Sequence, residues 1–119
     1  MKKFLRPLTL LLFSVVAFAS TFSTSEAAKH VGENATVCGI AASVHTATSS
    51  KGSPTFVNLD KPYPNQVFTI LVWGSDRGKF SPAPATWQGK NVCATGVITL
   101  YRGSPEIVAH EAGQISFPK

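Results

Sequence analysis

The chain has 119 residues, 14% of them charged and 44% hydrophobic, and its formal net charge is +5. This length suits one small domain with a single hydrophobic core, and it excludes an array of domains. No internal repeat, low-complexity tract or linker interrupts the sequence.

The first 27 residues have the layout of a secretory signal peptide. A positively charged start is followed by the apolar run Leu8–Ala19, and small residues then offer cleavage sites after Ala19 and after Ala27. The apolar run has 19 − 8 + 1 = 12 residues, fewer than the ~20 that span a bilayer. No cysteine follows either site, as a lipoprotein anchor would need. We expect cleavage after Ala27, with Ala19 as the alternative.

Removal of residues 1–27 leaves 119 − 27 = 92 residues, 28–119, as the mature domain. Three of the eleven Lys and Arg residues and one of the six Asp and Glu residues would be lost, so the net charge would fall from +5 to +3. A mild positive charge permits an anionic partner without requiring one. We expect a periplasmic or secreted protein with no stable membrane insertion after signal cleavage.

Five segments of the mature domain are predicted to be β-strands, because β-branched and aromatic residues fill them and turn residues separate them. They are Ala35–His45, Phe56–Leu59, Val67–Trp73, Lys90–Tyr101 and Glu106–His110. Prolines constrain the turn between the second and third strands. Between the third and fourth strands, residues 74–89 are rich in Pro and Gly. They predict an irregular insertion, with one or two helical turns near Ser75–Phe80 capped by Ser75 or Asp76.

Alternation of side chains predicts which residues enter the core. In the second strand we expect Val57 and Leu59 inside, with Phe56 and Asn58 pointing outward, because Asn is poor core material. The third strand is apolar on both faces, so a shift of one residue would reverse its assignment. We expect Gly39 and Gly96 at strand bends, and Phe80 and Trp87 at an open end of the core. The predicted core contributors are Val37, Val57, Leu59, Phe68, Ile70, Val92 and Ile107.

The order of these elements matches the OB-fold, a five-stranded Greek-key barrel. The predicted fold class is therefore an all-β, five-stranded Greek-key OB-fold barrel with a short irregular or helical insertion between strands three and four. A small β-sandwich is the main alternative, although five strands would make a thin one.

The chain also resembles the bacterial OB-fold families grouped with the anticodon-binding (tRNA_anti-like) domains, and small exported OB-fold proteins in particular. In those domains an aromatic residue early in the second strand stacks on a base, and Phe56 matches that position. The sequence departs from the pattern at Leu59-Asp60-Lys61, where anticodon-binding domains often have a Leu-Arg-Asp-like sequence. This departure and the expected export weigh against a tRNA-type role. The residues that carry the resemblance are Val37-Cys38-Gly39, Val44, residues 56–60, 63–65, 68–69, 92–98 and 103–107.

Cys38 and Cys93 are the two cysteines of the chain. An even count in an exported protein favours a disulfide, and a spacing of 93 − 38 = 55 fits no zinc or redox motif. The first and fourth strands of an OB-fold are antiparallel neighbours, so the fold assignment implies a Cys38–Cys93 disulfide. Two buried free thiols are the alternative.

Aromatic and basic residues make up the candidate ligand site. OB-folds bind single strands on strands two and three and on two loops, using stacking rings and a basic groove. In the alternative interpretation, the rings pack in the core and the lysines serve solubility. The candidate ligand-binding residues are Phe56, Asn58, Lys51, Arg102, Tyr63 and Trp73.

The sequence contains no motif for catalysis or for metal binding. The three histidines lack ligand spacing, and the five carboxylates of the mature chain do not cluster. We expect no enzyme, no metal and no cofactor. The predicted function is an exported, monomeric OB-fold module for single-stranded DNA or RNA or another anionic polymer. A protein-interaction or small-ligand module is the first alternative, and a nuclease-like enzyme is the second.

Overall fold

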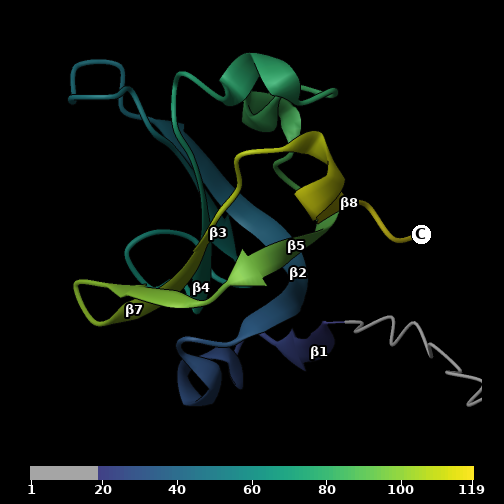
Figure 1. Ribbon diagram of the computed structural model, residues 1–119. Helices are drawn as coiled ribbons and strands as arrows, with labels where there is room; N and C mark the ends of the chain where they lie inside the picture. The colour runs from purple at the N-terminus through teal and green to yellow at the C-terminus, as the bar shows by residue number, and fades with distance from the viewer. Residues whose placement is uncertain (1–18) are drawn as a thin grey trace, which may run out of the picture.

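The computed structural model describes residues 19–119, and most of this part consists of short β-strands (Figure 1). Of the expected signal peptide, residues 1–18 lie outside the described part. The described part contains four 3₁₀ helices, and none of its helices is long and apolar enough to cross a membrane. The strands are β1 (Ser20–Ser23), β2 (Asn34–Thr46), β3 (Thr55–Leu59), β4 (Phe68–Val72), β5 (Asn91–Val97), β6 (Thr99–Tyr101), β7 (Ser104–Val108) and β8 (Ile115–Ser116). The 3₁₀ helices are η1 (Ala27–His30), η2 (Arg77–Lys79), η3 (Pro84–Thr86) and η4 (Ala112–Gln114).

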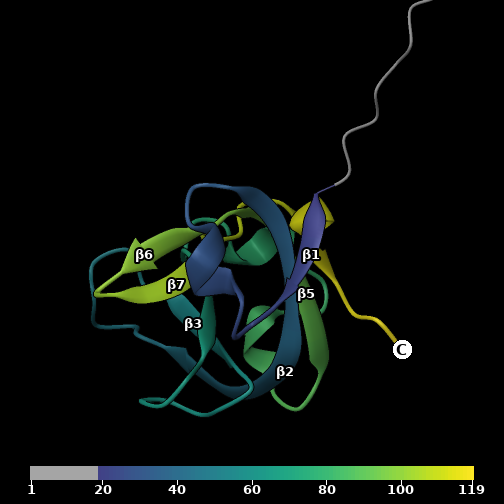
Figure 2. The same cartoon turned by 90° about the horizontal axis from the view of Figure 1, so that it is seen from below.

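The strands form one open sheet in the order β6-β7-β4-β3-β2-β5-β8, with β1 beside β2. The β4–β7 and β1–β2 pairs are parallel, and the other pairs are antiparallel. The long strand β2 pairs with β5 through residues 34–40 and with β3 through residues 41–46. Figure 2 shows the consequence: β1 and β5 lie on one side of the molecule, and the β6–β7 hairpin lies on the other.

Gly39 lies just before the point where β2 changes partner. An added Cβ there would lie 2.9 Å from Asp60 Oδ1 and 2.9 Å from Thr24 Cγ2. The Asp60 carboxylate occupies this space because it accepts hydrogen bonds from the Ile40 N–H, at 2.9 Å, and from the Thr24 hydroxyl. The close approach requires glycine.

The core has the register that side-chain alternation predicted. All seven expected contributors are fully buried, including Val57, Leu59 and Ile107. The inward set of β4 is also confirmed, because Phe68 and Ile70 belong to the same cluster.

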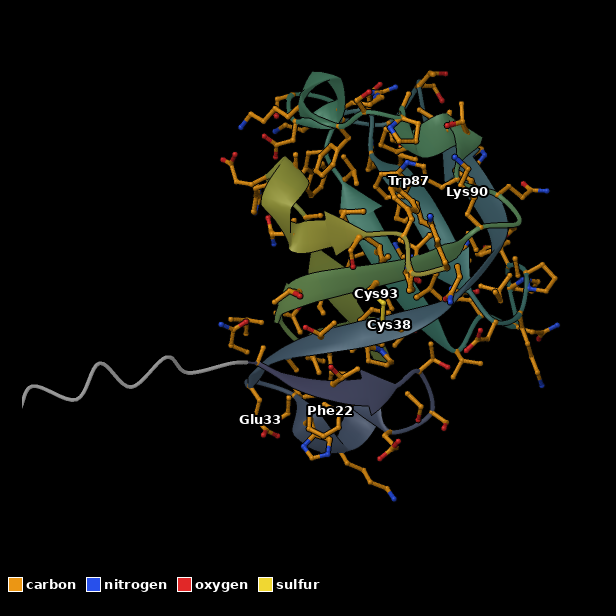
Figure 3. All side chains as sticks on the ribbon, turned by 90° about the vertical axis from the view of Figure 1, so that its right-hand side faces the viewer. Phe22, Glu33, Cys38, Trp87, Lys90 and Cys93 are labelled. Atoms are coloured by element: carbon orange, nitrogen blue, oxygen red, sulfur yellow. A yellow bond between two sulfur atoms is a disulfide. The ribbon has the colours of Figure 1, made fainter. Side chains whose placement is uncertain are left out.

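The Phe80 and Trp87 rings cover one end of this core, as expected. They are 6% and 1% exposed and meet edge to face, with centroids 5.8 Å apart. The Trp87 indole N–H donates to the Pro82 carbonyl oxygen at 2.9 Å. The Phe117 ring, near the C-terminus, packs edge to face on the same indole, with ring centroids 5.4 Å apart. Figure 3 shows Trp87 at this end of the molecule.

The number of strands differs from the prediction, since the described residues 19–119 contain eight where five were expected. The expected strand Lys90–Tyr101 divides at Ile98 into β5 and β6. The Ile98 N–H donates to the Glu33 carbonyl, at 3.0 Å, and its carbonyl accepts from the Gly32 N–H, at 2.8 Å. These bonds to the loop before β2 replace ladder bonds, so the strand is interrupted.

Strand β1 is a further addition, and it lies within the segment that the sequence assigned to the signal peptide. It pairs with residues 35–38 of β2, and Ala27, which follows it, is fully buried.

Cys38 and Cys93 form the expected disulfide between β2 and β5 (Figure 3). They are direct ladder partners, and their Cα atoms are 4.1 Å apart. No free cysteine occurs in the described residues.

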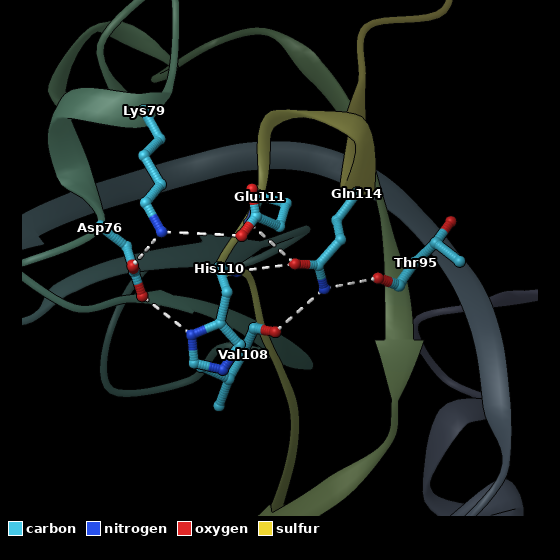
Figure 4. Close-up of polar contacts among 7 residues, drawn as sticks. All are labelled: Asp76, Lys79, Thr95, Val108, His110, Glu111 and Gln114. Atoms are coloured by element: carbon cyan, nitrogen blue, oxygen red, sulfur yellow. Dashed lines mark hydrogen bonds and ion pairs between the residues drawn. The ribbon is translucent and has the colours of Figure 1, made fainter.

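Side-chain contacts tie the insertion and the C-terminus to the sheet (Figure 4). Asp76 precedes η2, but its carboxylate makes no capping bond, contrary to expectation. Instead it accepts from His110 Nδ1 at 2.8 Å and lies 3.0 Å from Lys79 Nζ. These two hydrogen bonds, first from His110 and then from Lys79, lower the pKa of Asp76.

The Gln114 amide connects β5 to β7 (Figure 4). Its Nε2 donates to the Thr95 carbonyl at 2.9 Å and to the Val108 carbonyl at 3.2 Å. β5 and β7 are not ladder partners, so this side chain joins two strands that backbone pairing leaves separate.

Candidate ligand-binding groove

A row of polar side chains crosses four neighbouring strands on the face opposite the core. Ser43 of β2 is paired with Asn58 of β3, Asn58 with Thr69 of β4, and Thr69 with Glu106 of β7. The next residue along β7, Ile107, belongs to the core, so the pleat directs Glu106 to the outer face.

Asn58 is on the expected face but is buried, which corrects the prediction that it is free to contact a ligand. It is 2% exposed, and both ends of its amide have partners. Its Nδ2 donates to Ser43 Oγ at 3.1 Å, and its Oδ1 accepts from Thr69 Oγ1 at 3.2 Å. Ser43 Oγ also accepts from the Tyr63 N–H at 3.1 Å, so the row anchors the loop after β3. Because its neighbours satisfy it, Asn58 can be buried without an orphaned polar atom.

A groove of about 960 Å³ lies over this polar row. Asn58, Thr69 and Glu106 contribute to its lining, together with the rings of Phe56, Tyr63 and Tyr101. The Tyr63 and Tyr101 side chains are 73% and 52% exposed, so they rise above the sheet surface. This arrangement gives the groove flat apolar surfaces on which a planar group can stack.

A smaller hollow of about 280 Å³ adjoins the groove. Lys51 and Trp73 line it, and Phe56, Tyr101 and Glu106 line both hollows. The two hollows are therefore one continuous surface, which we call the outer groove. The outer groove brings together all six residues that the sequence proposed as a ligand site: Phe56, Asn58, Lys51, Arg102, Tyr63 and Trp73.

Phe56 lies at the junction of the two hollows. Its side chain was expected to be exposed, but it is half-buried, because Leu71 is its direct partner on β4 and His45 its partner on β2. Trp73, just past the end of β4, is 36% exposed. Both rings keep a free surface on the outer groove.

Arg102 begins the tight turn between β6 and β7. It has φ of +50° and Gly103 has φ of +78°, so the chain reverses over two left-handed residues, as hairpin turns require. The Arg102 guanidinium carbon lies 5.4 Å from the centroid of the Tyr101 ring. This cation–π contact keeps a positive charge beside the outer groove.

Glu106 lines the outer groove but was absent from the sequence-based site. Its side chain is 8% exposed, and burial raises the pKa of its carboxyl group. Because side chains alternate along a strand and Ile107 was expected in the core, the sequence could have placed Glu106 on the outer face. The sequence offered no signal for its burial, which depends on the neighbouring strands.

Gln66 also contributes to the groove lining. Its Oε1 atom is buried and has no hydrogen-bond partner among the described residues. Because this atom is closed off from solvent, a molecule in the groove does not reach it in this conformation.

Few charges line the outer groove. Arg102 and Glu106 are the charged residues of the larger hollow, and Lys51 and Glu106 those of the smaller one. His45 also lines the larger hollow. In the described residues no three His, Cys, Asp or Glu side chains are grouped to hold a metal ion.

Comparisons of the chain with protein-family models, with curated proteins and with solved structures each found no match. The candidate function therefore depends on the outer groove and on the residues that line it.

Proposed function

We propose that this protein is an exported OB-type module that binds single-stranded nucleic acid, or a similar anionic polymer, in the outer groove. The observation that carries the proposal is the gathering of four aromatic side chains along one face with Lys51 and Arg102 beside them. Stacking rings and a few basic residues are what non-specific single-strand sites combine. The aromatic side chains are Phe56, Tyr63, Trp73 and Tyr101.

The strand pairings support the OB-type assignment. Strands β2, β3 and β4 form an antiparallel meander, β5 pairs with β2, and β7 runs parallel to β4. We assign these five strands to the OB barrel, with β5 and β7 connected through Gln114. OB-folds bind polymers on strands two and three and on the first and last hairpin loops. In this chain those parts are β3, β4, the loop with Lys51 and the turn with Arg102.

Export is part of the proposal. Residues 1–19 have the signal-peptide layout, and cleavage after Ala19, the alternative site, leaves β1 and Ala27 in the mature domain. The Cys38–Cys93 disulfide supports an oxidising compartment, where such bonds persist. The polymer would therefore be met in the periplasm or outside the cell.

Each part of the outer groove has a defined task in this proposal. The Phe56 ring stacks on a base, and Tyr63 or Trp73 extends the stacking surface to a neighbouring base. Lys51 in the smaller hollow and Arg102 in the larger one contact phosphates and set the position of the strand. Asn58 holds the groove floor and the Tyr63 loop in place.

A neutral ligand or a protein segment is the second candidate, and the low charge of the outer groove favours it. One arginine and one carboxylate in the larger hollow provide little attraction for a highly charged polymer. A site of this kind would bind with little dependence on salt.

Salt dependence of binding separates the two candidates. We expect a fluorescent mixed-sequence single strand to bind with a slope of about −1.4 in log K against log salt. This slope corresponds to two phosphate contacts at about 0.7 each. Fluorescence anisotropy between about 50 and 200 mM salt gives the slope directly.

Lys51→Ala should reduce this slope by about half, because it removes one of the two contacts. Lys29→Ala is the matched control, since Lys29 is exposed and lies outside both hollows. Absence of salt-sensitive binding to any single strand would contradict the proposal and leave the neutral-ligand candidate.

A further inference from the structure

The Glu106 carboxylate lines both hollows of the outer groove and has no hydrogen-bond or ion-pair partner among the described residues. Its neighbours explain why. The Thr69 hydroxyl, across the ladder on β4, donates to Asn58 Oδ1. The Thr99 hydroxyl, across the ladder on β6, donates to the backbone carbonyl of Glu106 at 3.4 Å. Both adjacent hydroxyl groups therefore point their protons away from the carboxylate.

In the described part of the chain, none of the charged or titratable side chains around the outer groove forms an ion pair with the Glu106 carboxylate. His45, Lys51 and Arg102 line the hollows, but none lies within ion-pair distance of it. Burial of the residue partly desolvates this carboxylate, but its oxygens still reach solvent in the groove. A ligand that donates N–H groups to it would replace that solvent and supply the missing hydrogen bonds.

We propose that the outer groove selects guanine among the bases of a single strand, through the Glu106 carboxylate. The inference rests on the proposed single-strand function and adds base selectivity to it. A base stacked on Phe56 can bring its edge toward Glu106, because both residues line both hollows. The Watson–Crick edge of guanine presents an N1–H and an N2–H₂ side by side, and a carboxylate accepts two such parallel donors.

The other bases match the acceptors less well. Cytosine and adenine present one exocyclic amino group next to a ring-nitrogen acceptor, which faces a carboxylate unfavourably. Thymine and uracil present a single N–H between two carbonyl oxygens. The chemistry of the groove floor therefore ranks guanine first and thymine or uracil last.

Binding of thymidine strands that carry isolated guanines tests the inference and avoids the self-association of guanine runs. We expect wild-type protein to bind such a strand about tenfold more tightly than an all-thymidine strand, in line with one bidentate base contact. Strands with adenine or cytosine at the same positions should bind with intermediate affinity. Glu106→Gln should reduce the guanine preference severalfold, because an amide cannot accept both donors. Glu33→Gln, at an exposed carboxylate outside both hollows, should retain it.

A second measurement needs no variant. Burial raises the pKa of Glu106, and protonation removes one acceptor. The guanine preference of the wild-type protein should therefore decline as pH is lowered through that raised pKa. Equal affinity of the wild type for all strands, or an unchanged preference in Glu106→Gln, would overturn the inference while leaving single-strand binding in place. Failure to bind any strand would overturn the proposed function itself.

Discussion

The two halves of β2 carry outer faces of opposite character. Along residues 34–40 two cross-strand pairs bond to each other: Cys38 is bonded to Cys93, and the Thr36 and Thr95 hydroxyl groups lie 2.6 Å apart. Along residues 41–46 the face continues into β3, β4 and β7, where the outer groove lies. There the Glu106 carboxylate lacks a protein partner among the described residues.

The contrast separates structural from functional polar groups. On the disulfide side the Cys38–Cys93 and Thr36–Thr95 pairs are bonded within the protein, so those residues contribute to stability. On the groove side Asn58 is satisfied and holds the floor, but the Glu106 carboxylate has no hydrogen-bond partner among the described residues. Buried polar groups left without partners tend to lie at functional sites.

Removal of the disulfide should have the largest effect, and on stability alone. Cys38→Ala combined with Cys93→Ala should lower the free energy of unfolding by about 4 kcal/mol, from chain entropy over a sequence separation of 55. Urea unfolding of the variant and of the oxidised wild type measures the difference. Single-strand affinity of the folded variant should be unchanged, and a large loss of affinity would show that the two faces are coupled.

Phe56→Ala should weaken binding and leave stability nearly unchanged, the opposite of the disulfide variant. Loss of one stacked base should weaken single-strand affinity by about 1–3 kcal/mol, while thermal stability changes little because the ring lies outside the core cluster. Phe117→Ala is the matched control, since this half-buried ring packs on Trp87 and lines neither hollow. It should reduce stability and leave affinity intact. If Phe56→Ala mainly unfolds the protein, the ring is structural.

The smallest expected effect is on pH dependence. Because the folded-state pKa of Glu106 is raised by burial, its stabilising contribution is complete below the unfolded pKa and is lost as pH rises through the folded pKa. The contribution of Asp76 to stability has the opposite pH dependence. Hydrogen bonds from His110 and Lys79 lower its pKa, so this contribution is lost as pH falls through the folded-state pKa. The difference in unfolding free energy between Glu106→Gln and wild type isolates Glu106. It should grow in favour of the variant as pH rises, and a pH-independent difference would contradict the burial cost.

The sequence predicted those features of the fold that depend on local alternation. Val57 and Leu59 are in the core and Phe56 is on the other face because a strand has a period of two. The break at Ile98 was not predictable, because it depends on hydrogen bonds to a loop distant in sequence. Strand β1 was missed for a different reason: its residues matched a signal peptide better than a strand.

In the candidate site, too, some features follow from strand order and others depend on contacts between distant residues. Lys51 and Arg102 could be placed beside Phe56 because loop positions follow from strand order. The burial of Asn58 and the isolation of Glu106 depend on how the Ser43 and Thr69 hydroxyl groups are oriented across the ladder. Strand propensity and alternation carry no information about those orientations.

Titration of the ¹⁵N-labelled protein with a guanine-containing single strand tests the central claim most directly. Amide chemical shifts report which face contacts the ligand. We expect saturable shifts at Phe56, Thr69, Arg102 and Glu106, and small shifts around the Cys38–Cys93 pair. Shifts concentrated at the disulfide face, or no shifts at any strand concentration, would contradict the assignment of the outer groove as the binding site.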